Sequence, residues 1–223
     1  MWKNVSKKAL FVIVFTALGF LAMQVPFSNI LGSNIKFNLF DFYGPIAGAF
    51  MGSIWGLVLV AAMQFCNWAF HGFSTETSTL IRFFPMLLSV LYFARKTPWI
   101  LLIPGAAMIA FWIHPEGRQA WYYAFYWIIP FAMYFLRDRF LFARALGATF
   151  TAHCVGSVLF LWLLNLKAPM WIGLIPIVWM ERGLMAIGIT LTYMAFNFLL
   201  SVLVNKAGVN LPFVKLNPKY SLK

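Results

Sequence analysis

The chain has 223 residues, of which 63% are hydrophobic and only 10% are charged. A soluble domain covers its surface with roughly 25% charged residues, so this composition excludes a soluble enzyme and indicates a protein that lives in lipid. Seventeen basic residues against five acidic ones give a net charge of +12, and because they lie in short clusters between apolar segments, they are typical of cytoplasmic loops and contacts with anionic lipid rather than of nucleic-acid binding.

Apolar segments with lengths near the roughly 20 residues that cross a bilayer recur along the chain. We therefore predict an all-α fold, a polytopic transmembrane helical bundle with six to seven membrane segments, of which one is broken or re-enters the membrane. In this prediction residues 1–205 form a single transmembrane domain and residues 206–223 form a basic cytoplasmic tail. The predicted segments are 9–31, 43–65, 80–94, 98–114, 120–136, 143–166 and 170–204.

The first segment follows three lysines and so imitates a signal peptide. No small-x-small cleavage site follows it, and we expect an uncleaved first helix. The positive-inside rule places the later basic clusters together on the cytoplasmic side. Three predicted spans separate the first lysines from Arg95, so the N-terminus lies outside, or an early segment does not span, or residues 37–43 dip back into the membrane. We favour an early irregularity of the last kind. The later clusters are Arg95-Lys96, Arg137/Arg139/Arg144 and the lysines of the tail.

The second segment contains the most specific motif of the chain, G-P-x-x-G-x-x-x-G-x-x-x-G. Glycines spaced by four share one face of a helix, and in lipid the close backbone approach of small residues provides helix packing. The expected partner is a neighbouring helix of this chain, and the alternatives are a helix of a second protein or a face that slides during transport. We expect Asp41 to cap the start of this helix rather than to bind a coupling ion. The helix-packing residues are Gly44, Gly48, Gly52 and Gly56.

Polar side chains inside membrane segments are costly unless they are paired or face a cavity. Arg82 either snorkels to the interface or binds an anionic group of a solute. His153 either forms a helix–helix hydrogen bond or contacts a ligand, also as a proton-sensitive switch. Glu181 and Arg182 are adjacent and point in different directions on a regular helix, and we expect the overlong last segment to break beside them, where a half-helix end suits a binding site. Asn197 either joins two helices by a hydrogen bond or lines the site.

Aromatic residues flank the segments that lie on the outer side in this orientation. They form either an interfacial belt or a vestibule whose rings stack on a flat solute. Under the second interpretation Trp68 and Trp121 belong to the binding site. The predicted substrate-binding residues are then Arg82, Trp68, Trp121, His153, Glu181, Arg182 and Asn197.

The run G-P-I-A-G at residues 44–48 with Gly52, and the small and polar stretch 149–157, resemble the substrate-binding (S) components of energy-coupling factor transporters. Those proteins are small, basic bundles of six membrane helices. The resemblance implies capture of a vitamin-like micronutrient from the outer side, no ATPase of its own, and partnership with a coupling membrane subunit and its ATPases. The sequence contains no G-x-x-x-x-G-K loop, which agrees with that expectation.

The predicted function is that of a multi-pass cell-membrane subunit that binds and helps to transport a small ring-containing micronutrient. The alternatives are a structural or partner-binding subunit of a membrane complex, and a self-sufficient small carrier or channel. We do not expect an enzyme, because the three histidines of this chain lack the spacing of a haem or metal site. Cys66 and Cys154 form no C-x-x-C pair. We therefore predict no catalytic residue, no metal and no cofactor.

Overall fold

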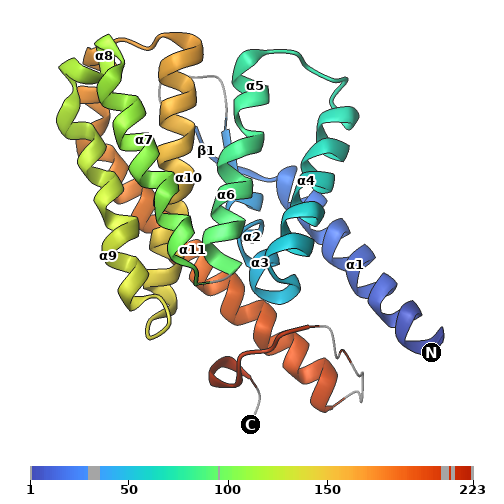
Figure 1. The fold of residues 1–223 in the computed structure, drawn as a ribbon. Helices are drawn as coiled ribbons and strands as arrows, with labels where there is room; N and C mark the ends of the chain where they lie inside the picture. Colours follow the sequence, from blue (N-terminus) through green and yellow to red (C-terminus); the bar gives the residue numbers. More distant parts are fainter. Residues whose placement is uncertain (1, 30–35, 95, 207–210, 212–213, 222–223) are drawn as a thin grey trace.

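The computed structural model describes residues 2–29, 36–94, 96–206, 211 and 214–221. Apart from one short β-hairpin, the regular structure in these ranges is helical (Figure 1). The chain begins with α1 (Trp2–Met23), the antiparallel strands β1 (Pro26–Asn29) and β2 (Lys36–Asn38), and the short helices α2 (Phe40–Tyr43) and α3 (Ile46–Met51). The later elements are α4 (Ser53–Phe70), α5 (Thr77–Ile81), α6 (Phe83–Ala94), η1 (Pro98–Leu101), α7 (Leu102–Ile113), α8 (Pro115–Gln119), η2 (Trp121–Ile128), α9 (Ile129–Leu136), α10 (Leu141–Leu164), α11 (Ala168–Asn205) and η3 (Pro218–Tyr220).

Four helical stretches of the described chain are long and apolar enough to cross a membrane. They are α4, the combined α5–α6 stretch, α10 and α11, and two shorter apolar helices cover Ala9–Met23 and Pro98–Ile113. The four long stretches each have about the 20 residues, or more, that a bilayer core requires. The prediction of a helical protein with several membrane spans is confirmed at this level.

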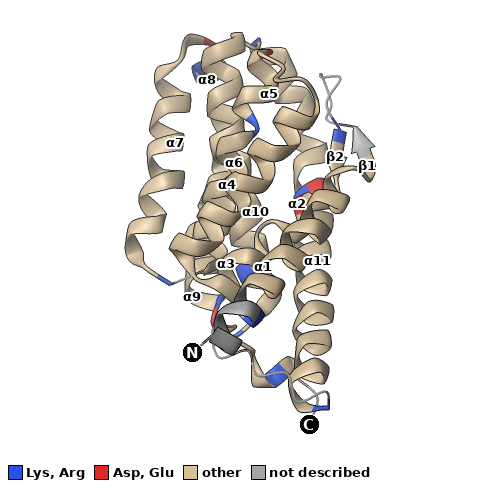
Figure 2. Ribbon diagram, turned by 90° about the vertical axis from the view of Figure 1, so that its right-hand side faces the viewer, with Lys and Arg blue, Asp and Glu red and all other residues tan. Residues whose placement is uncertain are grey.

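The early part of the chain turns back before it has crossed the bundle a second time. Helices α2 and α3 have only four and six residues, far fewer than a span requires. They return the chain toward the end of the bundle where both termini lie, and several Lys and Arg residues lie at that end (Figures 1 and 2). An early irregularity was one of the three explanations that the sequence left open for the position of the basic clusters. Arg95, one residue of those clusters, lies outside the described residues.

The predicted single helix over residues 43–65 is wrong, because the chain reverses at Gly52. Its φ of +82° lies in the left-handed region that favours glycine, so α3 ends there and α4 begins. The close packing expected of the motif is nevertheless present within this chain. A Cβ on Gly56 would lie 2.8 Å from the Cα of Gly48, and one on Gly48 would lie 2.5 Å from the carbonyl oxygen of Val90 on α6.

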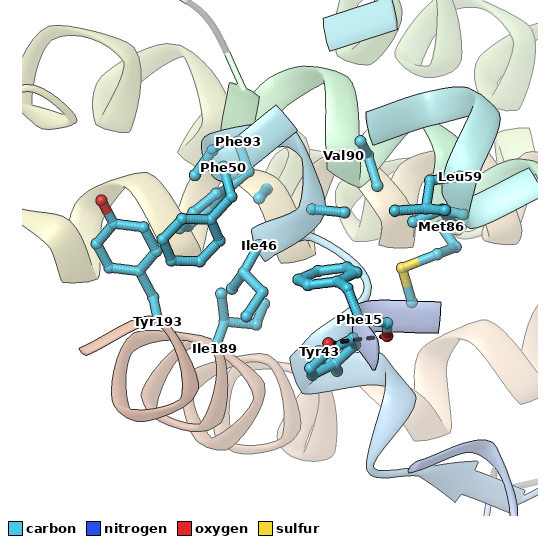
Figure 3. Packing of buried hydrophobic residues seen from close by; sticks show 14 of the residues in the cluster. Phe15, Tyr43, Ile46, Phe50, Leu59, Met86, Val90, Phe93, Ile189 and Tyr193 are labelled. Atoms are coloured by element: carbon cyan, nitrogen blue, oxygen red, sulfur yellow. Dashed lines mark hydrogen bonds between the residues drawn. The ribbon is translucent and has the colours of Figure 1, made fainter. Parts of the chain in front are cut away.

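Buried apolar side chains hold this returning segment in place (Figure 3). Ile46 and Phe50 of α3 are fully buried, and the ring of Phe50 stacks on Tyr193 of α11 with centroids 5.2 Å apart. The hydroxyl of Tyr43 donates to the carbonyl oxygen of Phe15 on α1 at 3.0 Å. Because α2 and α3 are anchored to both α1 and α11, the hairpin before them is fixed at mid-height of the bundle.

The predicted break of the last apolar segment beside Gly183 is wrong. Helix α11 runs through 38 residues with Pro176 inside it, about 57 Å at a rise of 1.5 Å per residue. Instead of breaking, it extends past the other helices (Figure 1). The described part of the C-terminal segment, residues 211 and 214–221, folds back on this extension and is called the C-terminal tail below.

Candidate functional site

A cavity of about 920 Å³ lies between α4, α5, α6, α10 and α11. Its remaining wall comes from the end of α1, the β-hairpin and α2. Side chains of the loops 71–76 and 165–167 also line it, and Figure 1 places both loops at the end opposite the termini. The cavity contains five of the seven residues predicted for substrate binding, which are Trp68, Arg82, His153, Glu181 and Arg182.

The wall nearest the hairpin carries the carboxylate of Asp41. One of its oxygens accepts a hydrogen bond of 2.9 Å from the backbone N–H of Asn38, whose own side chain accepts from the N–H of Phe40 at 3.1 Å. The prediction that Asp41 caps the glycine-rich helix is therefore wrong. It lies within the first turn of α2, where the N-cap position belongs to Leu39, and its carboxylate turns back onto the strand end.

The neighbouring wall carries Glu181 and Arg182 of α11, which form an ion pair with each other. The expectation that adjacent residues point apart is wrong here, because both long side chains bend toward the same cavity. Nη1 of Arg182 lies 3.5 Å from the hydroxyl of Thr149, and its guanidinium lies 5.0 Å from the ring centroid of Phe37 on β2. Arg182 is only 7% exposed, so ion pairing and ring contact replace the water that it has lost.

Arg82 lies at the junction of α5 and α6 and ties this junction to the hairpin. Its Nη2 donates to the backbone carbonyl of Lys36 at 2.9 Å. Its own carbonyl accepts from the side-chain amide of Gln64 on α4 at 3.3 Å. Arg82 thus joins three walls of the cavity. This structural contact differs from both roles predicted for Arg82, which were snorkelling to the interface and binding an anionic group of a solute.

Trp68 is held with its indole against the cavity by a hydrogen bond from Nε1 to the carbonyl oxygen of Ser74 at 2.7 Å. The ring of Phe83 lies edge-on to it, with centroids 6.1 Å apart. Further rings line the same cavity from β2, α2, α10 and α11, and the aromatic lining residues are Phe37, Phe40, Trp68, Phe83, Phe160 and Trp171. Rings that stand around a cavity in this way stack on a flat ligand with little loss of side-chain entropy.

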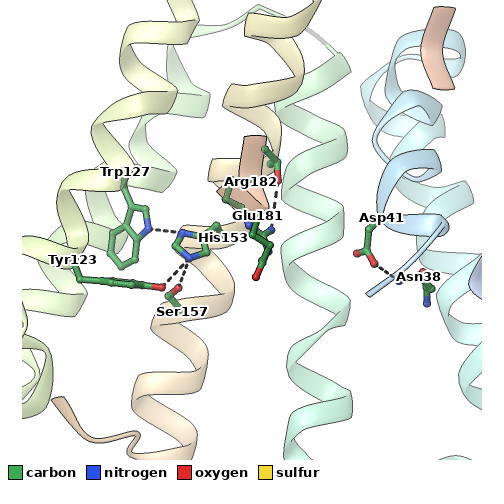
Figure 4. A network of polar contacts seen from close by, with 9 residues as sticks. Asn38, Asp41, Tyr123, Trp127, His153, Ser157, Glu181 and Arg182 are labelled. Carbon is green, nitrogen blue, oxygen red and sulfur yellow. Dashed lines mark hydrogen bonds and ion pairs between the residues drawn. The ribbon is translucent and has the colours of Figure 1, made fainter. Parts of the chain in front are cut away.

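His153 is fixed by two aromatic residues of η2 (Figure 4). The indole Nε1–H of Trp127 donates to its Nδ1 at 3.1 Å, and the hydroxyl of Tyr123 lies 2.9 Å from its Nε2. An indole N–H can only donate, so Nδ1 is an acceptor and the neutral ring carries its proton on Nε2. Because protein partners occupy both nitrogens, the helix–helix hydrogen bond is the interpretation that agrees with this geometry.

Two predicted site residues lie away from the cavity. Trp121 is 51% exposed, and its carbonyl oxygen accepts from the indole of Trp112 at 2.8 Å. Asn197 is fully buried and holds the C-terminal tail, accepting from the backbone N–H of Asn217 at 2.8 Å and donating to its carbonyl oxygen at 3.0 Å. Asn197 therefore joins a helix to the tail instead of joining two helices.

The sequence analysis did not select Asn38, Gln64 or Trp127 for the site. Of these three, only Trp127 could have been indicated by a sequence pattern, because it lies four residues after Tyr123 in an aromatic segment. Among the described residues there is no group of three or more His, Cys, Asp or Glu that would hold a metal ion. The cavity thus offers stacking surfaces and a few fixed charges, which suit reversible binding of a small solute.

No protein-family model, no curated protein and no solved structure matches this chain. A function is therefore inferred from the cavity and from the residues that line it.

Proposed function

We propose that this protein is a membrane-embedded subunit of a transport system, which binds a small ring-containing micronutrient in the cavity between α4 and α11. The observation that carries this proposal is the combination of about 920 Å³ of space with six aromatic rings and fixed charges in one lining. Ligand cavities of roughly 300–1,000 Å³ with apolar walls and a few polar groups are typical of small-molecule sites.

The proposed orientation places the cavity mouth outside the cell. Loops 71–76 and 165–167 lie at the mouth, whereas both termini lie at the opposite end together with several basic residues (Figures 1 and 2). Because cytoplasmic loops carry the excess of Lys and Arg, the end with the termini is assigned to the cytoplasm. A solute then enters from outside, as in the S components that the sequence resembles.

Energy for transport is proposed to come from a coupling membrane subunit with ATPases. The chain has no phosphate-binding G-x-x-x-x-G-K loop, and of its five acidic residues only Asp41, Glu76 and Glu181 line the cavity. Proton or cation coupling within one chain depends on carboxylates inside the membrane, and this scarcity favours a subunit over a self-sufficient carrier.

Small molecules that co-purify with the protein provide the test. The full chain is purified in detergent, extracted with organic solvent, and the extract is analysed by mass spectrometry. In Gly156→Leu a new side chain enters the cavity, because Gly156 lines it and a Cβ there already lies 3.4 Å from Pro85. Gly173→Leu is the matched control, since a Cβ at Gly173 has no neighbour within 4 Å and the residue is exposed.

A ring compound present with the wild type and Gly173→Leu, and lost from Gly156→Leu, is the expected result. An equal yield of the same compound from Gly156→Leu contradicts binding in this cavity. Uptake of that compound into liposomes that contain this chain alone would contradict the subunit role and favour a self-sufficient carrier.

A further inference from the structure

Asp41 differs from the other acidic residues in its surroundings. All five lie within the described residues, and three of them pair with a lysine or arginine nitrogen at 4.0 Å or less. Glu76 is exposed beside the mouth of the cavity, where water solvates it. Asp41 is half-buried at mid-height, and no cationic side chain of the described residues lies within that distance.

The two arginines nearest to Asp41 in electrostatic terms are Arg82 and Arg182, and both are held by other groups. Arg182 pairs with Glu181, and Arg82 donates to the Lys36 carbonyl oxygen. A carboxylate away from bulk water costs free energy unless a positive charge or several hydrogen bonds compensate it. The Asn38 N–H supplies one such bond at 2.9 Å, so capacity for a cation remains.

Elsewhere in the cavity lining, one buried donor, the Nε–H of Arg182, and one buried acceptor lack partners among the described residues. Oε1 of Gln64, on the α4 wall, is buried and accepts no hydrogen bond from the described residues. Among the rings that line the same cavity are Trp68 on α4 and Phe83 on α6. Aromatic faces attract cations as well as flat rings. Carboxylate, unpaired acceptor and aromatic faces together are complementary to a ligand that brings its own positive charge.

We propose that the cavity selects a flat ring compound bearing a cationic nitrogen, such as an ammonium or an amidinium group, and that Asp41 is the counter-charge for this nitrogen. This inference rests on the proposed function, because it names the chemical class of the solute for the same cavity. It assigns Asp41, and not the predicted residue Arg82, as the residue that determines selectivity for charge.

The test uses three indoles that share one ring and differ in charge at pH 7. Tryptamine is a cation, indole-3-ethanol is neutral and indole-3-acetate is an anion. Their affinities for the full chain in detergent are measured by isothermal titration calorimetry. A hydrogen bond to a charged group contributes about 1.5–3 kcal/mol, so tryptamine is expected to bind about tenfold to hundredfold more tightly than indole-3-ethanol.

Asp41→Asn is expected to remove this preference for tryptamine over indole-3-ethanol, and Asp41→Glu is expected to retain it. Asp138→Asn is the matched control, because it makes the same chemical change in an exposed residue that pairs with Lys96 outside the cavity. The comparison of the three indoles on the wild type needs no variant, so it decides the question even if a change at Asp41 prevents folding.

The outcomes separate this inference from the proposed function. Equal binding of the three indoles, or tightest binding of indole-3-acetate, overturns the assignment of a cationic ligand but leaves a ring-binding cavity. A preference for tryptamine that survives Asp41→Asn overturns the role of Asp41. Stabilisation by NaCl that depends on Asp41, without any preference among indoles, assigns the carboxylate to a metal cation and also overturns the inference. Binding of none of the three contradicts the proposed function itself.

Discussion

A methyl group added at Gly48 should destabilise the whole bundle, because this glycine is where α3 touches α6. An ideal Cβ there would lie 2.5 Å from the Val90 carbonyl oxygen and 2.8 Å from the Cβ of Ala94. The first of these neighbours is backbone near the end of α6, so it cannot rotate away as a flexible side chain would. Relief of the clash requires α3 to move away from α6.

Overpacking of this kind costs about 1–3 kcal/mol. For a chain of this size, about 2–4 °C of melting temperature corresponds to each kcal/mol, so Gly48→Ala is expected to lower the melting temperature by about 2–12 °C. Intrinsic tryptophan fluorescence during heating of the detergent-solubilised protein provides the measurement.

Gly183→Ala makes the same substitution inside α11, where a Cβ meets no atom within 4 Å. Alanine is favoured over glycine within a helix by about 0.5–1 kcal/mol, so this control is expected to melt at the wild-type temperature or slightly above it. If Gly48→Ala and Gly183→Ala melt together, the contact between α3 and α6 is not as close as described, and the packing role of the glycine is refuted.

Three further predictions follow from single contacts. Trp127→Phe leaves the Nδ1 acceptor of His153 without its donor and is expected to cost about 1–3 kcal/mol, seen as a lower melting temperature than that of a Trp→Phe change at an exposed site. The N–H of Ala168, and then the adjacent lysine, hold the pKa of Glu116 below its usual value. The stability that this contact contributes is therefore present above the ordinary glutamate pKa of about 4.3 and is lost as the pH falls through the lower pKa of the folded state. On acidification the melting temperature of Glu116→Gln should therefore fall less than that of the wild type. Parallel curves of melting temperature against pH would contradict this. Asn197→Ala removes the hydrogen bonds to the C-terminal tail and should make trypsin cleave the tail faster, whereas cleavage at the wild-type rate would show that the tail is held by other contacts.

Composition was sufficient to predict helices that cross a membrane, because a chain with so few charges has no way to cover a soluble surface. An early reversal of the chain was one of three ways to bring all the basic clusters to the same side of the membrane. The place of that reversal did not follow. A glycine that packs in a helix groove and a glycine with positive φ look alike in the sequence, and only the structure separates Gly48 from Gly52.

The rule that polar side chains in lipid face a cavity found Arg82, His153 and the pair on α11. It failed for Asn197, whose hydrogen-bond partner lies 20 residues further along in the tail. Residues such as Asn38 and Gln64 were missed because they meet the others only after the hairpin folds back, and no local pattern indicates that contact. The break predicted in the last segment was wrong because a long apolar helix need not break, and α11 instead extends past the other helices.

The half-height return of the chain has a consequence for hydration. The backbone around α2 is irregular, and its N–H groups find partners one by one: that of Leu39 donates to the Val25 carbonyl oxygen, and those of Phe42 and Tyr43 donate to the Leu39 carbonyl oxygen. Irregular backbone at membrane depth is tolerated only beside protein or water. The hollow next to Asp41 thus serves the architecture before any solute arrives, since it brings a wet surface to the place where the backbone requires one.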